Sequence, residues 1–327
     1  MLYLCNVRKI RKLSAFFLVA VIFAIGNSCR QDEGHEACRS AYYWSTVFEL
    51  DSQQRAFIQK QGIRKIYLRY FDVVMRDGEA MPNATVQVSA TVPKGVEIVP
   101  VVFIVNDCMR MAQPQLDSLL LTRILKMTET HDLGPVKEIQ IDCDWTKQTQ
   151  TAYFNMLERL HRRAAEKGIA LSVTIRLHQL SMTVPPVDKG VLMMYNTGDI
   201  TKRGGTNAIL DMKDVEPFLP ALDDYDLPLA TAYPVFAWKV AFRGQHFLGF
   251  MHADDELPLT TGDTVLTVAP SPETVLKARD AVEKVRPRAN DEMILYEISS
   301  QNLKRINTYH YEKVYDCRAV HAQHDSH

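Results

Sequence analysis

The chain has 327 residues, with 38 lysines and arginines against 39 aspartates and glutamates, and a formal net charge of −1 at pH 7. A balance this close to neutral argues against nucleic acid or any other highly charged partner. The length suits either two domains of average size or one α/β barrel, which needs about 250 residues.

The N-terminus has the pattern of a secretion signal. A positively charged segment at 8–12 precedes an uncharged apolar run at 13–26, and Cys29 follows a few small or polar residues. The run is shorter than the roughly 20 residues that span a bilayer, which favours a cleaved signal over an anchor helix. We expect residues 1–28 to be a signal peptide and Cys29 to carry a lipid. The alternative is an uncleaved anchor helix.

Both interpretations place the rest of the chain outside the cytoplasm. We expect a lipoprotein attached to the bacterial cell envelope, at the outer membrane, with residues 29–39 as a polar tether that lifts the folded part off the membrane. Residues 319–327 are expected to form a disordered tail. The partners that follow from this pattern are the membrane, through the lipid, and whatever ligand the folded part binds.

Beyond the tether, strand-like runs alternate with amphipathic helices, which is typical of a parallel sheet built from βα units. This pattern predicts a single (β/α)8 TIM barrel over residues 40–318. An open doubly wound sheet is the alternative, but it usually carries a glycine-rich turn after its first strand, and none is present. The expected strands are 41–48, 65–73, 97–105, 138–145, 170–177, 190–195, 229–236 and 293–298, and the expected helices are 51–61, 114–131, 149–167, 214–225 and 272–285.

Two units of the barrel are expected to be irregular. Residues 75–94, after the second strand, are too polar and β-branched for a helix. Residues 240–268, after the seventh strand, are long and contain turn signals at Arg243-Gly244 and Thr261-Gly262-Asp263. We expect this second segment to form a hairpin excursion over one mouth of the barrel.

Cysteine spacing gives no metal site. Cys38, Cys108, Cys143 and Cys317 follow the proposed lipid cysteine, without a CxxC pair or a Cys/His cluster. We expect no metal and no cofactor. Cys38 and Cys317 flank the folded region, whose ends are neighbours in a closed barrel, so they form either a disulfide or two separate thiols.

Charged and aromatic residues concentrate where the predicted strands end, which is where the active sites of such barrels lie. Strand alternation places Asp142 and Asp144 on the inner face of one strand, and Arg176 and His178 on the inner face of the next. Inward charges are costly unless paired, so these groups either pair with one another, as an Asp142–Arg176 salt bridge, or bind a ligand.

A family resemblance supports the second interpretation. The segment Ile-Asp-Cys-Asp-Trp at 141–145 resembles the strand-four segment of chitinase-like barrels of glycoside hydrolase family 18, whose motif is Asp-x-Asp-x-Glu with the last acid as proton donor. Asp142 and Asp144 match the first two acids, but the donor position falls on Thr146. Met-Met-Tyr-Asn is similar to the family's strand-six Met-x-Tyr-Asp, with Asn196 in place of the Asp. The overall pattern also resembles barrel lipoproteins of Bacteroidetes related to glycoside-hydrolase-like barrels.

These observations predict an envelope-anchored, glycoside-hydrolase-like barrel that hydrolyses or binds a glycan. If the protein is an enzyme, Asp144 and Glu297 are the expected acid/base or nucleophile pair, and Asp142 would raise the pKa of Asp144 by repulsion. The expected substrate-binding residues are polar or aromatic side chains near the strand ends, namely Trp44, Arg69, Arg176, His178, Tyr195, Asn196, Tyr233 and Trp238.

Two other functions remain open. A non-catalytic glycan-binding or scaffold lipoprotein is favoured by Thr146, which cannot replace an acid. A metal-assisted hydrolase would use Asp72, Asp107, Asp142 and Asp144, but the sequence lacks the histidine pairing that such a site needs.

Overall fold

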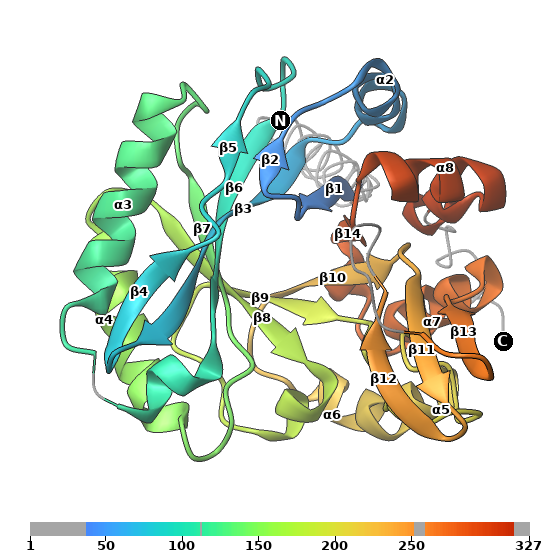
Figure 1. Cartoon of the computed structure of the whole chain (residues 1–327). Coiled ribbons are helices and arrows are strands. Elements are labelled where there is room, and N and C mark those ends of the chain that lie inside the picture. The colour runs from blue at the N-terminus through green and yellow to red at the C-terminus, as the bar shows by residue number, and fades with distance from the viewer. Residues whose placement is uncertain (1–36, 112, 252–258, 317–327) are drawn as a thin grey trace, which may run out of the picture. The chain divides into compact units, whose positions relative to one another are not determined.

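A computed structural model describes residues 37–111, 113–251 and 259–316, and confirms the predicted barrel. Eight parallel strands form a closed ring, because the first strand pairs with both the last and the second (Figure 1). In ring order these strands are β1 (Cys38–Tyr43), β3 (Lys65–Arg76), β6 (Glu97–Ile104), β7 (Glu138–Asp142), β8 (Ala170–Arg176), β9 (Lys189–Met193), β10 (Leu229–Pro234) and β14 (Glu292–Tyr296).

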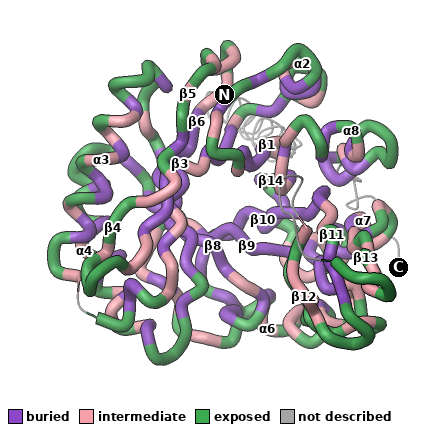
Figure 2. Tube along the Cα trace, viewed as in Figure 1, coloured by how far each residue is buried: buried purple, intermediate pink, exposed green. Residues whose placement is uncertain are grey.

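Helices cover the outside of the barrel, and most begin and end close to their predicted positions. Buried residues line the inner face of each helix while the outer faces are exposed (Figure 2). Asp51 and Gln54 form a capping box that starts the first helix, and Gly62 ends it in the left-handed conformation. These helices are α2 (Ser52–Gln61), α3 (Leu116–Thr130), α4 (Gln150–Ala165) and α7 (Pro272–Val285).

The helix expected at 214–225 is wrong as a single element. The chain instead forms α5 (Met212–Val215), the 3-10 helix η3 (Glu216–Phe218) and α6 (Leu219–Asp223). Pro217 and Pro220 lack the backbone N–H that a continuous helix requires, so the segment breaks into short pieces. An additional helix, α8 (Ser300–Tyr309), follows the last barrel strand.

Both irregular units are present, and each contains more strand than expected. After β3 the chain returns as β4 (Glu79–Asn83), antiparallel to β3, and then forms β5 (Gln87–Val88) beside β2 (Val47–Phe48). The excursion after β10 is a three-stranded antiparallel sheet rather than a hairpin. Its strands are β11 (Trp238–Arg243), β12 (His246–Phe250) and β13 (Asp263–Val268).

The first strand is shorter than predicted at its carboxyl end. We expected one strand over residues 41–48, but β1 ends at Tyr43. The Tyr43 hydroxyl donates a hydrogen bond to the carbonyl of Glu49, 2.7 Å away, and so holds the chain in a bend. This bend brings Trp44 to the end of the barrel where the carboxyl ends of the strands meet.

Four charged side chains close the opposite, N-terminal end of the barrel. Each is the first residue of its strand, and Lys189 Nζ lies 2.9 Å from Glu138 and 3.0 Å from Glu292. Lys65 Nζ lies 3.2 Å and 3.4 Å from the same two carboxylates. Burial acts to raise the pKa of Glu292, but Lys189 and Lys65 outweigh it and hold that pKa below its ordinary value. Because each lysine contacts both glutamates, the free-energy cost of burying the four charges is offset by ion pairs.

Several predictions concern residues at the two ends of the chain that the structure does not describe. The signal peptide, Cys29, most of the tether, Cys317 and the predicted tail lie outside the described residues. They stay predictions, as does the Cys38–Cys317 disulfide. Among the helices of the described part, none is both long and apolar enough to cross a membrane.

Candidate functional site at the carboxyl ends of the barrel strands

A cavity of about 360 Å³ lies where the barrel strands end. Its volume falls in the range of small-ligand sites, and its position matches that of active sites in (β/α)8 barrels. Six barrel strands and the start of α8 contribute to it. The lining residues are Trp44, Asp142, Arg176, Tyr195, Asn196, Phe236, Ala237, Trp238, Tyr296, Glu297, Ser299, Gln301 and Asn302.

One guanidinium joins two carboxylates on this side of the barrel. Asp142, the last residue of β7, is only 4% exposed and accepts a 2.6 Å hydrogen bond from the Thr174 hydroxyl. Arg176, the last residue of β8, lies 3.5 Å from Asp142 through Nη2 and 2.5 Å from Asp144 through Nε. The inner face that strand alternation predicts therefore holds Asp142, Thr174 and Arg176 together.

Burial and pairing oppose each other in this cluster. Burial raises the pKa of the Asp142 carboxyl, and the opposite effects of Arg176 and Thr174 do not cancel the shift. Burial alone would lower the pKa of Arg176, but the opposite effect of Asp142 and Asp144 is larger and raises that pKa, so the guanidinium stays charged. The ionised form of Asp142 is therefore less favoured than that of a solvent-exposed aspartate, although Arg176 is nearby.

Glu297 lines the cavity from the end of β14. One oxygen accepts a hydrogen bond from the backbone N–H of Trp44 at 3.1 Å, and the other accepts from the Asn302 amide at 3.3 Å. Burial raises the pKa of Glu297 despite these bonds and the more distant charge of Arg69. No ion pair of Glu297 occurs within the described residues, and in this respect it differs from Asp142.

Aromatic rings form a continuous part of the cavity wall. The Tyr296 ring centroid lies 5.6 Å from that of Trp44, 5.6 Å from that of Phe236 and 4.7 Å from that of Tyr195. Phe236 in turn lies 5.3 Å from Trp238. The Tyr195 hydroxyl is buried and has no hydrogen-bond partner among the described residues. Because buried hydroxyls are normally hydrogen-bonded, this unsatisfied group in the cavity wall is an exception.

Besides Arg69, three of the site residues predicted from sequence do not line the cavity. His178 is exposed, because β8 ends at Arg176 and the chain turns into a 3-10 helix (Leu177–Ser181). Tyr233 donates a 2.7 Å hydrogen bond to Asn290, just before β14, so its hydroxyl points away from the mouth. Asp144 has a side chain that is 57% exposed and does not line the cavity. The expected catalytic pair of Asp144 and Glu297 is therefore not assembled in this cavity.

Arg69 lies behind the cavity wall rather than in it. Its Nε donates a 2.8 Å hydrogen bond to Asp72, and its guanidinium lies 5.4 Å from the centroid of the Trp44 ring. Arg69 therefore positions Trp44 rather than lining the cavity. Sequence analysis missed Tyr296, although its position near the end of a predicted strand offered a signal. The contribution of Asn302 depends on α8, which sequence analysis did not predict.

The carboxylates proposed for a metal site are not brought together. Asp72 is bonded to Arg69, and Asp107 forms an exposed pair with Arg110 at 2.7 Å. Within the described ranges, no three His, Cys, Asp or Glu side chains form a group that could hold a metal ion.

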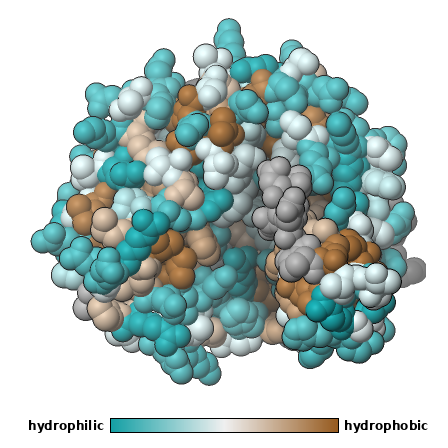
Figure 3. Space-filling model, viewed as in Figure 1, coloured by the Kyte–Doolittle hydropathy of each residue, from teal (hydrophilic) through white to brown (hydrophobic). Residues whose placement is uncertain are grey.

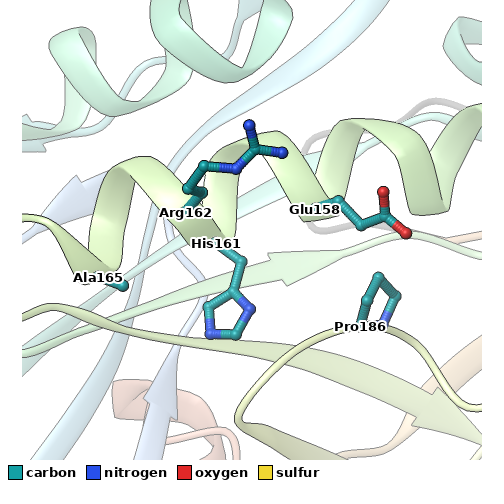
Figure 4. Close-up of a pocket in the computed structure, with 5 residues that line it drawn as sticks. All are labelled: Glu158, His161, Arg162, Ala165 and Pro186. Atoms are coloured by element: carbon teal, nitrogen blue, oxygen red, sulfur yellow. The ribbon is translucent and has the colours of Figure 1, made fainter.

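Two other hollows on the surface lack the features of the mouth. One of about 340 Å³ lies along α4, where the His161 ring contacts Asp188 at 3.0 Å and Pro186 faces the helix (Figure 4). Another, of about 400 Å³, is an apolar groove between the β3–β4 hairpin and α3 that includes the exposed Met81 and Leu119. On the side of the molecule where α3 and β4 lie, several hydrophobic residues are visible on the surface among mainly hydrophilic ones (Figure 3). Neither hollow combines buried charge with unpartnered polar groups.

Comparisons with known proteins agree with the fold. No family model matches the chain, and no curated protein matches its sequence. Among solved structures, it is similar to a chitinase from Chromobacterium violaceum, with a TM-score of 0.55 and 11% identity over 86% of this chain and 100% of that chain. It is also similar to the spore cortex-lytic enzyme SleL of Bacillus cereus, with a TM-score of 0.52 and 14% identity over 83% of this chain and 74% of that one.

A third similar structure is the family 18 chitinase ChiB of Flavobacterium johnsoniae, with a TM-score of 0.51 and 10% identity over 86% of this chain and 94% of that chain. At identities this low, the similarity shows the fold alone. The protein therefore has a (β/α)8 barrel whose fold is similar to that of these structures, and its chemistry has to be argued from its own residues.

Proposed function

We propose that this protein binds a glycan in the cavity at the carboxyl ends of its barrel strands. The observation that carries the proposal is the composition of the cavity wall, in which the aromatic residues Trp44, Trp238 and Tyr296 occur together with the carboxyl groups of Asp142 and Glu297. Sugar rings have apolar C–H faces that pack on aromatic rings, and hydroxyls that need hydrogen-bond partners. The similar structures named as chitinases support the same class of ligand and suggest chitin oligosaccharides as first probes.

Binding without hydrolysis is the function that the site favours. In the segment that resembles family 18, the donor position is Thr146, an exposed residue that cannot protonate a leaving group. Asp144 is bonded to Arg176 and stands outside the cavity lining. This segment therefore does not supply the cavity with the proton donor that the usual two-carboxylate mechanism requires.

Hydrolysis is a second candidate because of Glu297. Its carboxyl lines the cavity, and burial raises its pKa, which is the direction of shift that favours a general acid. If the bound glycan is cleaved, Glu297→Gln should lower the turnover by a factor on the order of 100 or more. No product release by the wild-type protein would leave binding as the function.

The location of this site in the cell is part of the proposal. We infer that the protein is exported and attached to the cell envelope through a lipid on Cys29, with the barrel held outside the cytoplasm by the polar tether. The uncharged run at 13–26 and the cysteine that follows it support this placement. A glycan of the envelope or of the surroundings would then be within reach of the cavity.

The direct test uses the full chain, purified in detergent, on a glycan array that includes chitin oligosaccharides. Hits are then titrated by calorimetry against wild type and Trp238→Ala. We expect Trp238→Ala to weaken binding by a factor on the order of 10, because the ring forms part of the wall. Val265→Ala, an exposed change on β13 of the same inserted sheet, should leave binding unchanged. Equal loss in both variants, or no hit at all, would contradict the proposal.

A further inference from the structure

The charges around the cavity do not balance. Asp142 and Asp144 share the single guanidinium of Arg176. Glu297 has hydrogen bonds from neutral groups only, the Trp44 backbone and the Asn302 amide. Arg69 cannot neutralise it at contact distance, because its guanidinium is bonded to Asp72. The cavity therefore contains one half-buried carboxylate, Glu297, for which the described residues provide no cation at contact distance.

The surroundings of this carboxylate suit a cationic group. Tyr296 precedes Glu297 in the sequence, and the backbone N–H of Trp44 donates a hydrogen bond to the Glu297 carboxylate. The ring centroids of Trp44 and Tyr296 are 5.6 Å apart. Aromatic faces carry negative charge density and attract ammonium groups within about 6 Å. A cavity lined by both a carboxylate and aromatic rings can thus offer an ammonium group an ion pair and ring contacts together.

A second observation indicates that a ligand with hydroxyl groups shares this space. Tyr195 is 4% exposed and lines the cavity, yet its hydroxyl has no partner among the described residues. Buried hydroxyls are normally hydrogen-bonded, so a ligand group that reaches this hydroxyl would supply the partner that it lacks. A sugar hydroxyl would satisfy it while the ring packs on Tyr296, whose centroid is 4.7 Å from that of Tyr195.

We propose that the glycan bound here carries a free amino group, as in glucosamine units that lack the N-acetyl group, and that its ammonium binds the carboxylate of Glu297. This inference rests on the proposed glycan-binding function and specifies its ligand class. An N-acetylated unit has no charge to offer Glu297, and a uronic acid would be repelled by it. The cavity should therefore rank amino sugars above acetylated sugars, and acetylated sugars above acidic ones.

The test compares three ligands of equal length: hexamers of glucosamine, of N-acetylglucosamine and of a uronic acid. The full chain in detergent is titrated with each at neutral pH. We expect the glucosamine hexamer to bind about tenfold more tightly than the acetylated one, which is the usual size of a hydrogen bond to a charged group. Glu297→Gln should remove this preference, while Glu49→Gln, an exposed carboxylate outside the cavity lining, should keep it.

The outcomes separate the two proposals. Binding of none of the hexamers would overturn the glycan-binding function itself. Equal or tighter binding of the acetylated hexamer by the wild-type protein would overturn the amino-sugar inference and leave glycan binding standing, whether or not the variant folds. A preference that survives in a folded Glu297→Gln protein would show that another group recognises the ammonium.

Discussion

Arg176 allows the charge cluster at the mouth to be tested by a double-mutant cycle. The sequence alone suggests that Asp142→Asn leaves Arg176 unpaired, with a loss of about 3–5 kcal/mol in the free energy of unfolding. In the structure, however, Arg176 is also bonded to Asp144 at 2.5 Å. Either single neutralisation therefore leaves the guanidinium with one carboxylate, and the large loss should require both changes.

The expected magnitudes follow from burial. Asn at position 142 can still accept the Thr174 hydrogen bond, and it removes a buried charge, so Asp142→Asn should cost about 1 kcal/mol or less. Asp144 is largely exposed, and exposed pairs contribute roughly 0.2–1 kcal/mol. The double variant leaves Arg176, with a side chain only 17% exposed, without a carboxylate, and should lose about 3–5 kcal/mol.

The assay is urea unfolding of the wild type, both single variants and the double variant at pH 7. The slope of the free energy against urea concentration is checked for constancy across the four proteins. The double variant should lose at least 1 kcal/mol more than the two single losses combined. Losses that simply add up would show that Arg176 does not bridge the two carboxylates, and that the described geometry of the cluster is wrong.

Three further predictions concern other parts of the chain. Because burial raises the folded-state pKa of Asp142, the destabilisation caused by its charge is fully present above that pKa and disappears as the pH falls. Wild type should thus gain stability relative to Asp142→Asn in urea titrations carried from pH 7 to about pH 4; a constant difference would contradict the shift. Lys189→Met should lower the free energy of unfolding by about 3 kcal/mol, since Lys65 alone then faces Glu138 and Glu292; an unchanged urea midpoint would refute the role of this network. Mass spectrometry of the membrane fraction should find an acylated N-terminal Cys29, and an unprocessed N-terminus there would defeat the lipoprotein assignment.

The sequence predicted the barrel because its strands and helices differ in period, and it predicted the Asp142–Arg176 neighbourhood because β7 and β8 alternate strictly. The same reasoning placed His178 in the mouth. This prediction was wrong because β8 ends at Arg176, two residues before His178, so the strand alternation does not extend to it. Tyr233 was misplaced for another reason. Every residue of β10 is buried, and a strand buried on both faces has no visible alternation from which its inner side could be identified.

Other features of the site were beyond local patterns. Glu297 was a candidate because it lies at the end of a predicted strand, but one of the hydrogen bonds that it accepts comes from the backbone of Trp44, which is 253 positions away in the sequence. The contribution of Asn302 depends on the placement of α8 beside the mouth. In contrast, the break of the helix at 214–225 was readable, because Pro217 and Pro220 stand inside the range that was predicted as helical.

The most direct test of glycan binding at the mouth uses the three tryptophans of the chain. Trp44 and Trp238 line the cavity, whereas Trp145 is fully buried and lies 5.1 Å from Phe154 of α4 by ring centroids. The fluorescence of the full chain in detergent is followed while chitin and glucosamine oligosaccharides are added. We predict a saturable change with at least one ligand that is retained in Trp145→Phe and lost when Trp44 and Trp238 are both replaced by Phe. No saturable change with any ligand, or a change that survives in the double variant, would contradict a glycan site in this cavity.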